Sequence, residues 1–246
     1  MFFPIKDYNP TRTVSYITII IILINIVVFI YQGYVSGPGL PHYVNHYSMV
    51  PYEISHMKNV RILVDRDMFG APVLQERALS PLLSIVSSMF MHGSIMHLLG
   101  NMLFLWIFGN NIEDYLGKVL FVMFYLVSGT GAALFHVLFN PNSLIPVIGA
   151  SGAVSGVMGA YLILFPKAKV KTLVFIFIIV TFIDIPAGIF LAIWFVFQFF
   201  YTGSGGIAWL AHVGGFISGG LLIYLVKLKK PVVQIIDNEN FFKEEE

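Results

Sequence analysis

The chain has no cysteine and few charged residues. Without cysteine it forms no disulfide and offers no thiolate as a nucleophile or metal ligand. Charged residues make up 11% of its 246 positions, well below the roughly 25% found in soluble domains. The net charge is +1 and no basic stripe is available to bind phosphate, so nucleic acid is not an expected partner. Hydrophobic residues make up 57% of the chain, which is typical of a protein embedded in a lipid bilayer.

Six apolar segments are candidates for membrane-spanning helices, because about 20 helical residues cross the hydrocarbon core. They cover residues 13–35, 94–108, 116–139, 147–165, 185–201 and 206–226. The sequence therefore predicts an all-α polytopic membrane protein with six transmembrane helices, whose membrane domain covers residues 13–226. Residues 1–12 and 227–246 are expected to be its cytoplasmic ends.

Basic residues indicate the orientation of these segments, since lysine and arginine favour the cytoplasmic side. With six spans, Lys6, Lys118 and the lysines within 227–230 share that side, whereas a seventh span would place the last cluster outside. We therefore expect residues 172–183 to lie on the inner face or fold back, and residues 36–81 to form an external, membrane-associated loop. The first segment is too long for a cleavable signal core, so we expect a retained anchor in the inner membrane of a prokaryote.

A serine stands near the start of the fourth candidate span, in the string GASG at residues 149–152. The unpaired N–H groups at a helix N-terminus carry partial positive charge, which would stabilise an oxyanion formed beside Ser151. Helix packing is the alternative interpretation, because the serine stands among glycines that let membrane helices approach closely. The glycines expected to serve packing, here and in the last span, are Gly149, Gly152, Gly156, Gly215 and Gly219.

A histidine lies at the corresponding depth of the last span, in the string AHVGG at residues 211–215. Both spans begin on the external side, so Ser151 and His212 should lie at one level. His212 alone would be interpreted as a packing residue. The small residues along both helices, however, would bring hydroxyl and imidazole within hydrogen-bond reach. Such a pair is the minimal nucleophile and base of acyl transfer, which predicts a hydrolase site inside the bilayer.

A second polar group occupies the outer part of the second span. His97 and Asn101 are four residues apart and share one helix face, where they would donate to an oxyanion or bind a neighbouring helix. His92 is expected nearer the surface, at a cap or a water entrance. His92 and His97 are five residues apart, which is poor ligand spacing, and no carboxylate falls nearby. A metal ion is therefore not expected.

Acidic residues are missing from the expected depth of His212. Asp184, Glu113 and Asp114 should lie at inner ends of the spans, too far away to bind the imidazole. The sequence therefore predicts a Ser–His dyad without a third, acidic member.

In their order, these strings resemble the rhomboid family of intramembrane serine proteases. The matching strings are FMHGSIMHLLGNM at 90–102, Gly109 with Glu113, LG at 116–117, GASG at 149–152, and AHVGG at 211–215 with Gly219. The resemblance covers roughly residues 80–226 and implies the six-helix bundle of that family.

The resemblance also implies a role for each residue. Ser151 would be the nucleophile and His212 the general base, and the Ser151 backbone N–H, Asn101 and His97 would form the oxyanion site. The expected partners are the lipid bilayer and membrane-protein substrates. Such substrates would enter past the second and fifth helices and be cut in or beside their transmembrane segment. No cofactor is implied, and the sequence carries no signal for an oligomeric state.

Two positions depart from other family members. Some carry a tyrosine one turn after the nucleophile, stacked on the histidine; Ser155 stands there in this chain, so His212 must be held in another way. Some carry a Trp-Arg pair in the first external loop, and residues 36–81 contain none. Two other functions compete: a non-catalytic relative that binds client membrane proteins, and a transporter. The transporter is disfavoured because acidic residues avoid the core of the spans.

Overall fold

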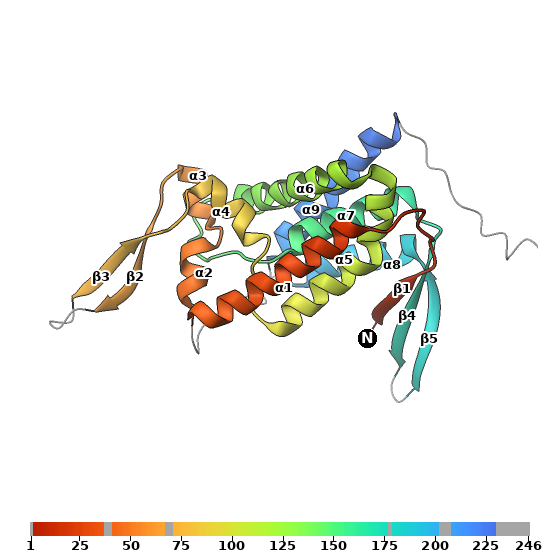
Figure 1. The fold of residues 1–246 in the computed structure, drawn as a ribbon, viewed down its shortest axis with the longest axis horizontal. Helices are drawn as coiled ribbons and strands as arrows, with labels where there is room; N and C mark the ends of the chain where they lie inside the picture. The colour runs from red at the N-terminus through yellow and green to blue at the C-terminus, as the bar shows by residue number, and fades with distance from the viewer. Residues whose placement is uncertain (1, 37–40, 67–70, 177–178, 202–207, 230–246) are drawn as a thin grey trace, which may run out of the picture.

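The computed structural model describes residues 2–36, 41–66, 71–176, 179–201 and 208–229 (Figure 1). Its body is a bundle of the helices α1 (Tyr16–Ser36), α5 (Ile95–Leu116), α6 (Lys118–Phe139), α7 (Ser151–Leu164), α8 (Ala187–Gln198) and α9 (Trp209–Lys227). These helices fall within or close to the six apolar segments of the sequence. A helix satisfies the backbone hydrogen bonds of such a segment internally, which lipid requires.

Among the described helices, α1, α5, α6 and α9 are long and apolar enough to cross a membrane. α7 has 14 residues and α8 has 12, so these two helices are about 21 and 18 Å long, against ~30 Å of hydrocarbon. The predicted class, a polytopic helical membrane protein, is confirmed. The count of six spans stays a prediction.

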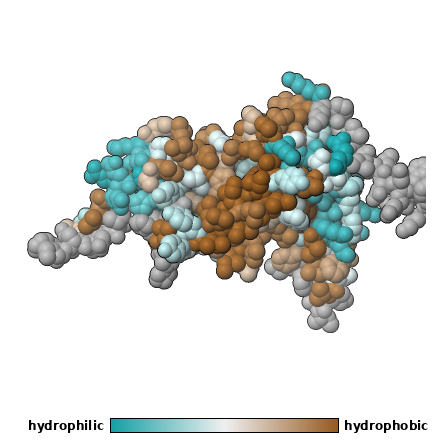
Figure 2. Space-filling view, in the orientation of Figure 1, coloured by the Kyte–Doolittle hydropathy of each residue, from teal (hydrophilic) through white to brown (hydrophobic). Residues whose placement is uncertain are grey.

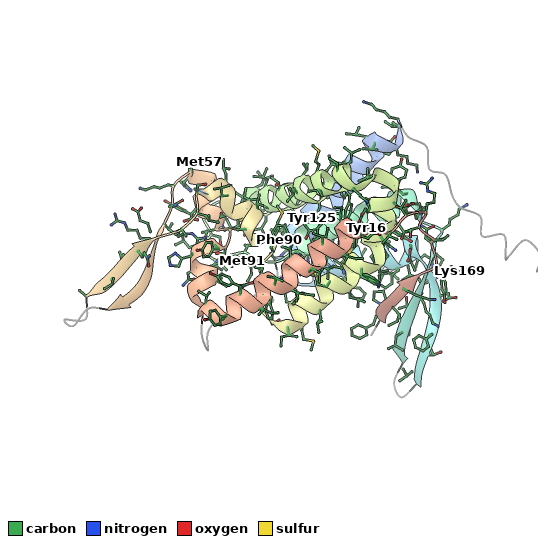
Figure 3. All side chains as sticks on the ribbon, in the orientation of Figure 1. Tyr16, Met57, Phe90, Met91, Tyr125 and Lys169 are labelled. Atoms are coloured by element: carbon green, nitrogen blue, oxygen red, sulfur yellow. The ribbon has the colours of Figure 1, made fainter. Side chains whose placement is uncertain are left out.

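The surface of the bundle divides into an apolar middle and two polar ends. Hydrophobic side chains cover the middle, over α1 and α5, and hydrophilic side chains gather at either end (Figure 2). Tyr16 and Lys169 mark one end and Met57 marks the other (Figure 3). Val27 and Ile30 of α1 are 63% and 66% exposed, as expected of side chains that face lipid.

α7 lies at the centre of the bundle, packed against α9, α6 and α5. Every residue in 152–161 is buried. Because α7 is shorter than the hydrocarbon core is thick, at least one of its ends lies within the depth of the bilayer.

The segment between α1 and α5 forms short elements. They are α2 (Pro41–Tyr47), α3 (Pro51–His56), the hairpin of β2 (Arg61–Arg66) with β3 (Pro72–Glu76), and α4 (Pro81–Ser88). Each of these helices starts with proline. The first N–H of a helix has no intrahelical partner, so proline, which lacks an N–H, loses no hydrogen bond at that position. A buried ion pair ties the segment together: Arg77 Nε lies 3.1 Å from Glu53 Oε2. Arg77 also donates to the Ser48 carbonyl.

A three-stranded antiparallel sheet lies at the other end of the bundle, in the order β1-β4-β5. Its strands are β1 (Phe2–Asp7), β4 (Lys169–Ile176) and β5 (Ile179–Pro186). Val170, Thr172 and Val174 are buried on one face of β4, as the period of two requires. We expected residues 172–183 on the inner face or folded back; the described residues of this stretch, 172–176 and 179–183, pair with each other as antiparallel strands. The pairing of the N-terminal residues with β4 is a feature that we did not predict from the sequence.

Acidic side chains at the end of α5 hold the start of α1. Glu113 is 2% exposed and accepts from the Thr18 N–H at 2.7 Å, the Thr18 hydroxyl at 2.8 Å and the Ile17 N–H at 3.0 Å. A carboxylate at a helix N-terminus meets the positive end of the helix dipole. The neighbouring Asp114 accepts from the N–H of Thr13. Both carboxyl groups are therefore used to fix α1 at the sheet end of the bundle.

Candidate active site

Ser151 and His212 are in hydrogen-bond contact. Ser151 is the first residue of α7, and its Oγ lies 2.9 Å from Nε2 of His212 on α9. Both side chains are partly buried between the helices. The structure thus brings together the two residues that we expected at one depth.

Glycines of α7 and α9 permit this contact by letting the two backbones touch. A Cβ atom on Gly215 would collide with the carbonyl oxygen of Gly152, and one on Gly219 would collide with the carbonyl of Gly156. A larger residue at either position would force the helices apart. The separation of Ser151 from His212 therefore depends on these glycines.

Gly149 allows a turn rather than a contact between helices. Its φ is +131°, a conformation that L side chains rarely adopt, and its N–H donates to the Ser88 carbonyl at 2.9 Å. A Cβ atom there would lie 2.7 Å from Nε2 of His97. Glycine lets the chain turn into α7 while the His97 ring lies against the turn.

Asn101 is bound to a histidine and not to the serine. Its Nδ2 lies 3.0 Å from Nε2 of His92, and the His97 ring meets the His92 ring edge-on with 5.0 Å between centroids. Among the described residues, no hydrogen bond joins Asn101 or His97 to Ser151. His92 is fully buried within the bundle. Its expected position near the membrane surface stays a prediction.

A glutamine of α1 fixes the backbone at His92. Gln32 donates from Nε2 to the His92 carbonyl at 3.3 Å and accepts from the His92 N–H at 3.1 Å. The side chain of Gln32 is fully buried. We did not predict this residue, although an amide in an apolar span is a signal of function or packing. Through Gln32 and His92, α1 helps to place Asn101.

His212 has a further partner that we did not predict. Its Nδ1 lies 2.7 Å from Oε1 of Gln198, the last residue of α8. Gln198 is 3% exposed. The carboxylate of Glu113 accepts from α1 and that of Asp114 from Thr13 just before it, and Asp184 lies in strand β5, opposite Lys171 in the register. An amide therefore occupies the place where a triad would carry an acid.

Ser155 does not hold His212. Its hydroxyl donates to the Ser151 carbonyl at 2.6 Å, along its own helix. The ring of Trp194 lies near His212, with 6.1 Å between the centroids. The side of His212 away from Ser151 therefore meets two residues of α8, Gln198 and Trp194.

A small cavity of about 30 Å³ adjoins Ser151. Its lining is mostly small or apolar and includes Met89, Gly129, Ala132, Ala153 and Ala211. A space of this size admits a water molecule or two. The residues in the described ranges contain no group of three or more histidine or acidic side chains placed to hold a metal ion.

Fold and site together define a multi-pass helical membrane protein that holds a serine against a histidine between two helices of its bundle. The chain belongs to the rhomboid family: residues 80–229, more than half of it, match the family model described as Rhomboid domain. The resemblance that we found in the sequence is thereby confirmed.

Several curated relatives match this chain over 151 to 159 residues. "Rhomboid protein 1, mitochondrial" of Saccharomyces cerevisiae is 32% identical over 159 residues, covering 61% of this chain and 43% of the relative. "RHOMBOID-like protein 6, mitochondrial" of Arabidopsis thaliana is 30% identical over 155 residues, covering 59% and 44%. "RHOMBOID-like protein 4" of the same plant is 30% identical over 151 residues, covering 59% and 34%.

The chain thus spans less than half the length of these curated relatives. All three are eukaryotic proteins and two are named as mitochondrial. They give no support to the inner membrane of a prokaryote that we expected from the sequence.

Proposed function

We propose that the chain is an intramembrane serine endopeptidase that cleaves membrane proteins in or beside their transmembrane segment. The distance of 2.9 Å between Ser151 Oγ and His212 Nε2 carries this proposal. A hydroxyl in hydrogen-bond contact with an imidazole can transfer its proton as it attacks a carbonyl carbon. Membership of the rhomboid family supports the same reaction class by analogy.

The reaction would run in two half-reactions. In the first, Ser151 Oγ bonds to the peptide carbonyl carbon while its proton passes to His212 Nε2. The C–N bond then breaks, and Nε2 gives the proton to the leaving amine. In the second, water gives a proton to Nε2 and its oxygen to the acyl carbon, and the ester to Ser151 breaks as Oγ recovers a proton. The cavity beside Ser151 has room for that water.

The oxyanion would form at the start of α7. The N–H groups of the first helical turn have no partner within the helix, and the Ser151 N–H is the nearest of them to the attacked carbon. The Asn101 amide has two hydrogens, and the contact with His92 uses one of them at most. His97 lies against Gly149, two residues before the nucleophile. We assign the Ser151 N–H, Asn101 and His97 to the oxyanion site.

Substrates would enter between α5 and α8. Aromatic rings join these helices: 6.4 Å separates the ring centroids of Phe104 and Trp194, and 6.3 Å those of Phe108 and Phe190. Apolar contacts of this kind can open without exposing an unpaired polar group to lipid. A transmembrane segment could therefore approach Ser151 from the side.

Ser151 would lie toward the external face and the sheet toward the cytoplasm. At the far end of α7, the Ile163 carbonyl accepts from Lys227, and Tyr161 donates to Asp7 of β1. Basic residues of β1, β4 and the ends of α6 and α9 belong to the same end, namely Lys6, Lys118, Lys169, Lys171 and Lys227. The cytoplasmic preference of lysine would then put residues 2–12 and 227–229 inside.

A fluorophosphonate probe tests the proposal directly. The purified protein should be labelled, and Ser151→Ala should abolish both labelling and cleavage of a single-span substrate. Ser155→Ala removes a hydroxyl one turn away in the same helix and should keep the labelling. Labelling that survives in Ser151→Ala would overturn the assignment. A folded protein that neither labels nor cleaves would instead support a non-catalytic relative that binds client membrane proteins.

A further inference from the structure

The second ring nitrogen of His212 is bound to a buried amide. Nδ1 lies 2.7 Å from Oε1 of Gln198. Gln198 is 3% exposed and closes α8, whose sequence AGIFLAIWFVFQ contains no other amide or charged group. A polar side chain in such surroundings is costly unless its hydrogen bonds are made. Both ends of the Gln198 amide have a partner.

The second partner of Gln198 fixes which way its amide points. Nε2 donates to the carbonyl of Trp194 at 2.9 Å, one helical turn back. A carbonyl oxygen only accepts, so the nitrogen must face Trp194 and the oxygen must face His212. The reverse orientation would set two oxygens against each other.

This orientation determines the tautomer of His212. Amide oxygen only accepts, so the hydrogen of the neutral imidazole is on Nδ1. Nε2 is then free of hydrogen and accepts from Ser151 Oγ, 2.9 Å away. The other tautomer would put a hydrogen on Nε2, where it could not take the serine proton.

We infer that Gln198 is a positioning residue that keeps His212 in the tautomer and ring orientation needed to deprotonate Ser151. The inference rests on the proposed function and adds a third member to the dyad. Unlike a carboxylate, the amide brings no charge into hydrocarbon, where an ionised group is expensive. Ser155 is bonded along its own helix, so it offers His212 no alternative support.

The closing experiment compares Gln198→Met with Gln198→Glu. Methionine keeps the length of the side chain and removes the acceptor. A glutamate kept protonated by its apolar surroundings keeps an accepting oxygen at the same place and donates its O–H to the Trp194 carbonyl. Gln198→Met should slow fluorophosphonate labelling by roughly 10²-fold, less than the ~10⁴ seen when a charged triad acid is neutralised. Gln198→Glu should recover at least a tenth of the parent rate. Ser155→Ala serves as the local packing control and should label at the parent rate.

A spectroscopic readout separates positioning from folding. Nitrogen NMR of ¹⁵N-histidine protein, with His212→Ala to assign its signals, reports which ring nitrogen carries the hydrogen. The parent and Ser151→Ala should show hydrogen on Nδ1, and Gln198→Met should lose that preference. Hydrogen on Nε2 in the parent, or an unchanged tautomer or labelling rate in Gln198→Met, would overturn the inference. If the parent does not label at all, the proposed function fails, and the tautomer of the parent still decides whether Gln198 positions His212.

Discussion

The α-carbon of Gly215 lies so close to the carbonyl oxygen of Gly152 that a methyl group has no room between them. This contact joins α9 to α7 three residues after His212 and one residue after Ser151. The distance between the side chains of Ser151 and His212 is therefore set by direct contact between the two helix backbones. Helices packed through longer side chains would stand farther apart.

Alanine at Gly215 should damage both the fold and the reaction. The added methyl collides with backbone, which cannot turn aside as a side chain can, so we expect a destabilisation of roughly 1–3 kcal/mol or more. Labelling of Ser151 should fall with it. Gly220→Ala, on the same helix, is the matched control because its nearest neighbour would be 3.7 Å away. Thermal unfolding in detergent and labelling rates check both variants, and equal behaviour of the two would contradict this reading of the packing.

Asn101→Ala should lower turnover by about 10²- to 10³-fold if Asn101 donates to the oxyanion. Substrate affinity should change little, because the bond forms only as negative charge develops. Gly100→Ala, at the preceding position, is the control because no atom lies within 4 Å of the added methyl. Steady-state cleavage of a single-span substrate gives both constants. A parent-like turnover would reduce Asn101 to holding His92.

Arg77→Met should destabilise the protein strongly, because it leaves the buried carboxylate of Glu53 without its cation. Both side chains are at most 1% exposed, and loss of one member of such a pair typically costs about 3–5 kcal/mol. Adding Glu53→Gln to Arg77→Met should return part of that loss. Arg61→Met breaks an ion pair of the β2–β3 hairpin whose side chains are 66% and 77% exposed, and it should change little. Unfolding midpoints that do not separate Arg77→Met from Arg61→Met would refute the prediction.

Asp7 should make stability depend on pH. Burial raises the pKa of Asp7 to about 6, from 3.8. A carboxyl whose pKa is raised by folding stabilises the fold while protonated, so this contribution is full below about pH 4 and is lost as pH rises through 6. Between pH 4 and 7.5 the parent should therefore lose up to about 3 kcal/mol relative to Asp7→Asn, which does not titrate. Unfolding curves of the two proteins that stay parallel across this range would show that Asp7 is not the group responsible.

Ser151 and His212 could be placed from the sequence because two simple regularities converge on them. Each stands near the start of an apolar span, and glycines at four-residue spacing follow or flank both. Depth and close approach then follow from helix geometry alone. The place of Asn101 in the site could be predicted because it shares a helix face with His97. Its hydrogen bond to His92 could not, since nine residues separate the two and a loop joins them.

The contact of Gln198 with His212 and the three-stranded sheet could not be predicted in this way. An amide at the end of an apolar run is equally typical of a residue at the membrane surface, and only the fold shows that it meets His212. The strands β4 and β5 are apolar enough to be counted with the spans, and the pairing of β1 with β4 joins residues about 170 positions apart. Long-range pairing of this kind leaves no periodic signal in the sequence.

The first helix is fastened at both extremes. Glu113 accepts three hydrogen bonds from the first turn of α1. Near the other end of α1, Gln32 makes two hydrogen bonds to the backbone of His92. Removing α1 would leave the carboxylate of Glu113 without these hydrogen-bond donors. It would also release the loop at His92, the residue that contacts Asn101. α1 is thus a structural support of the folded unit, and a truncated protein that begins after it should no longer hold His92 and Asn101 in place.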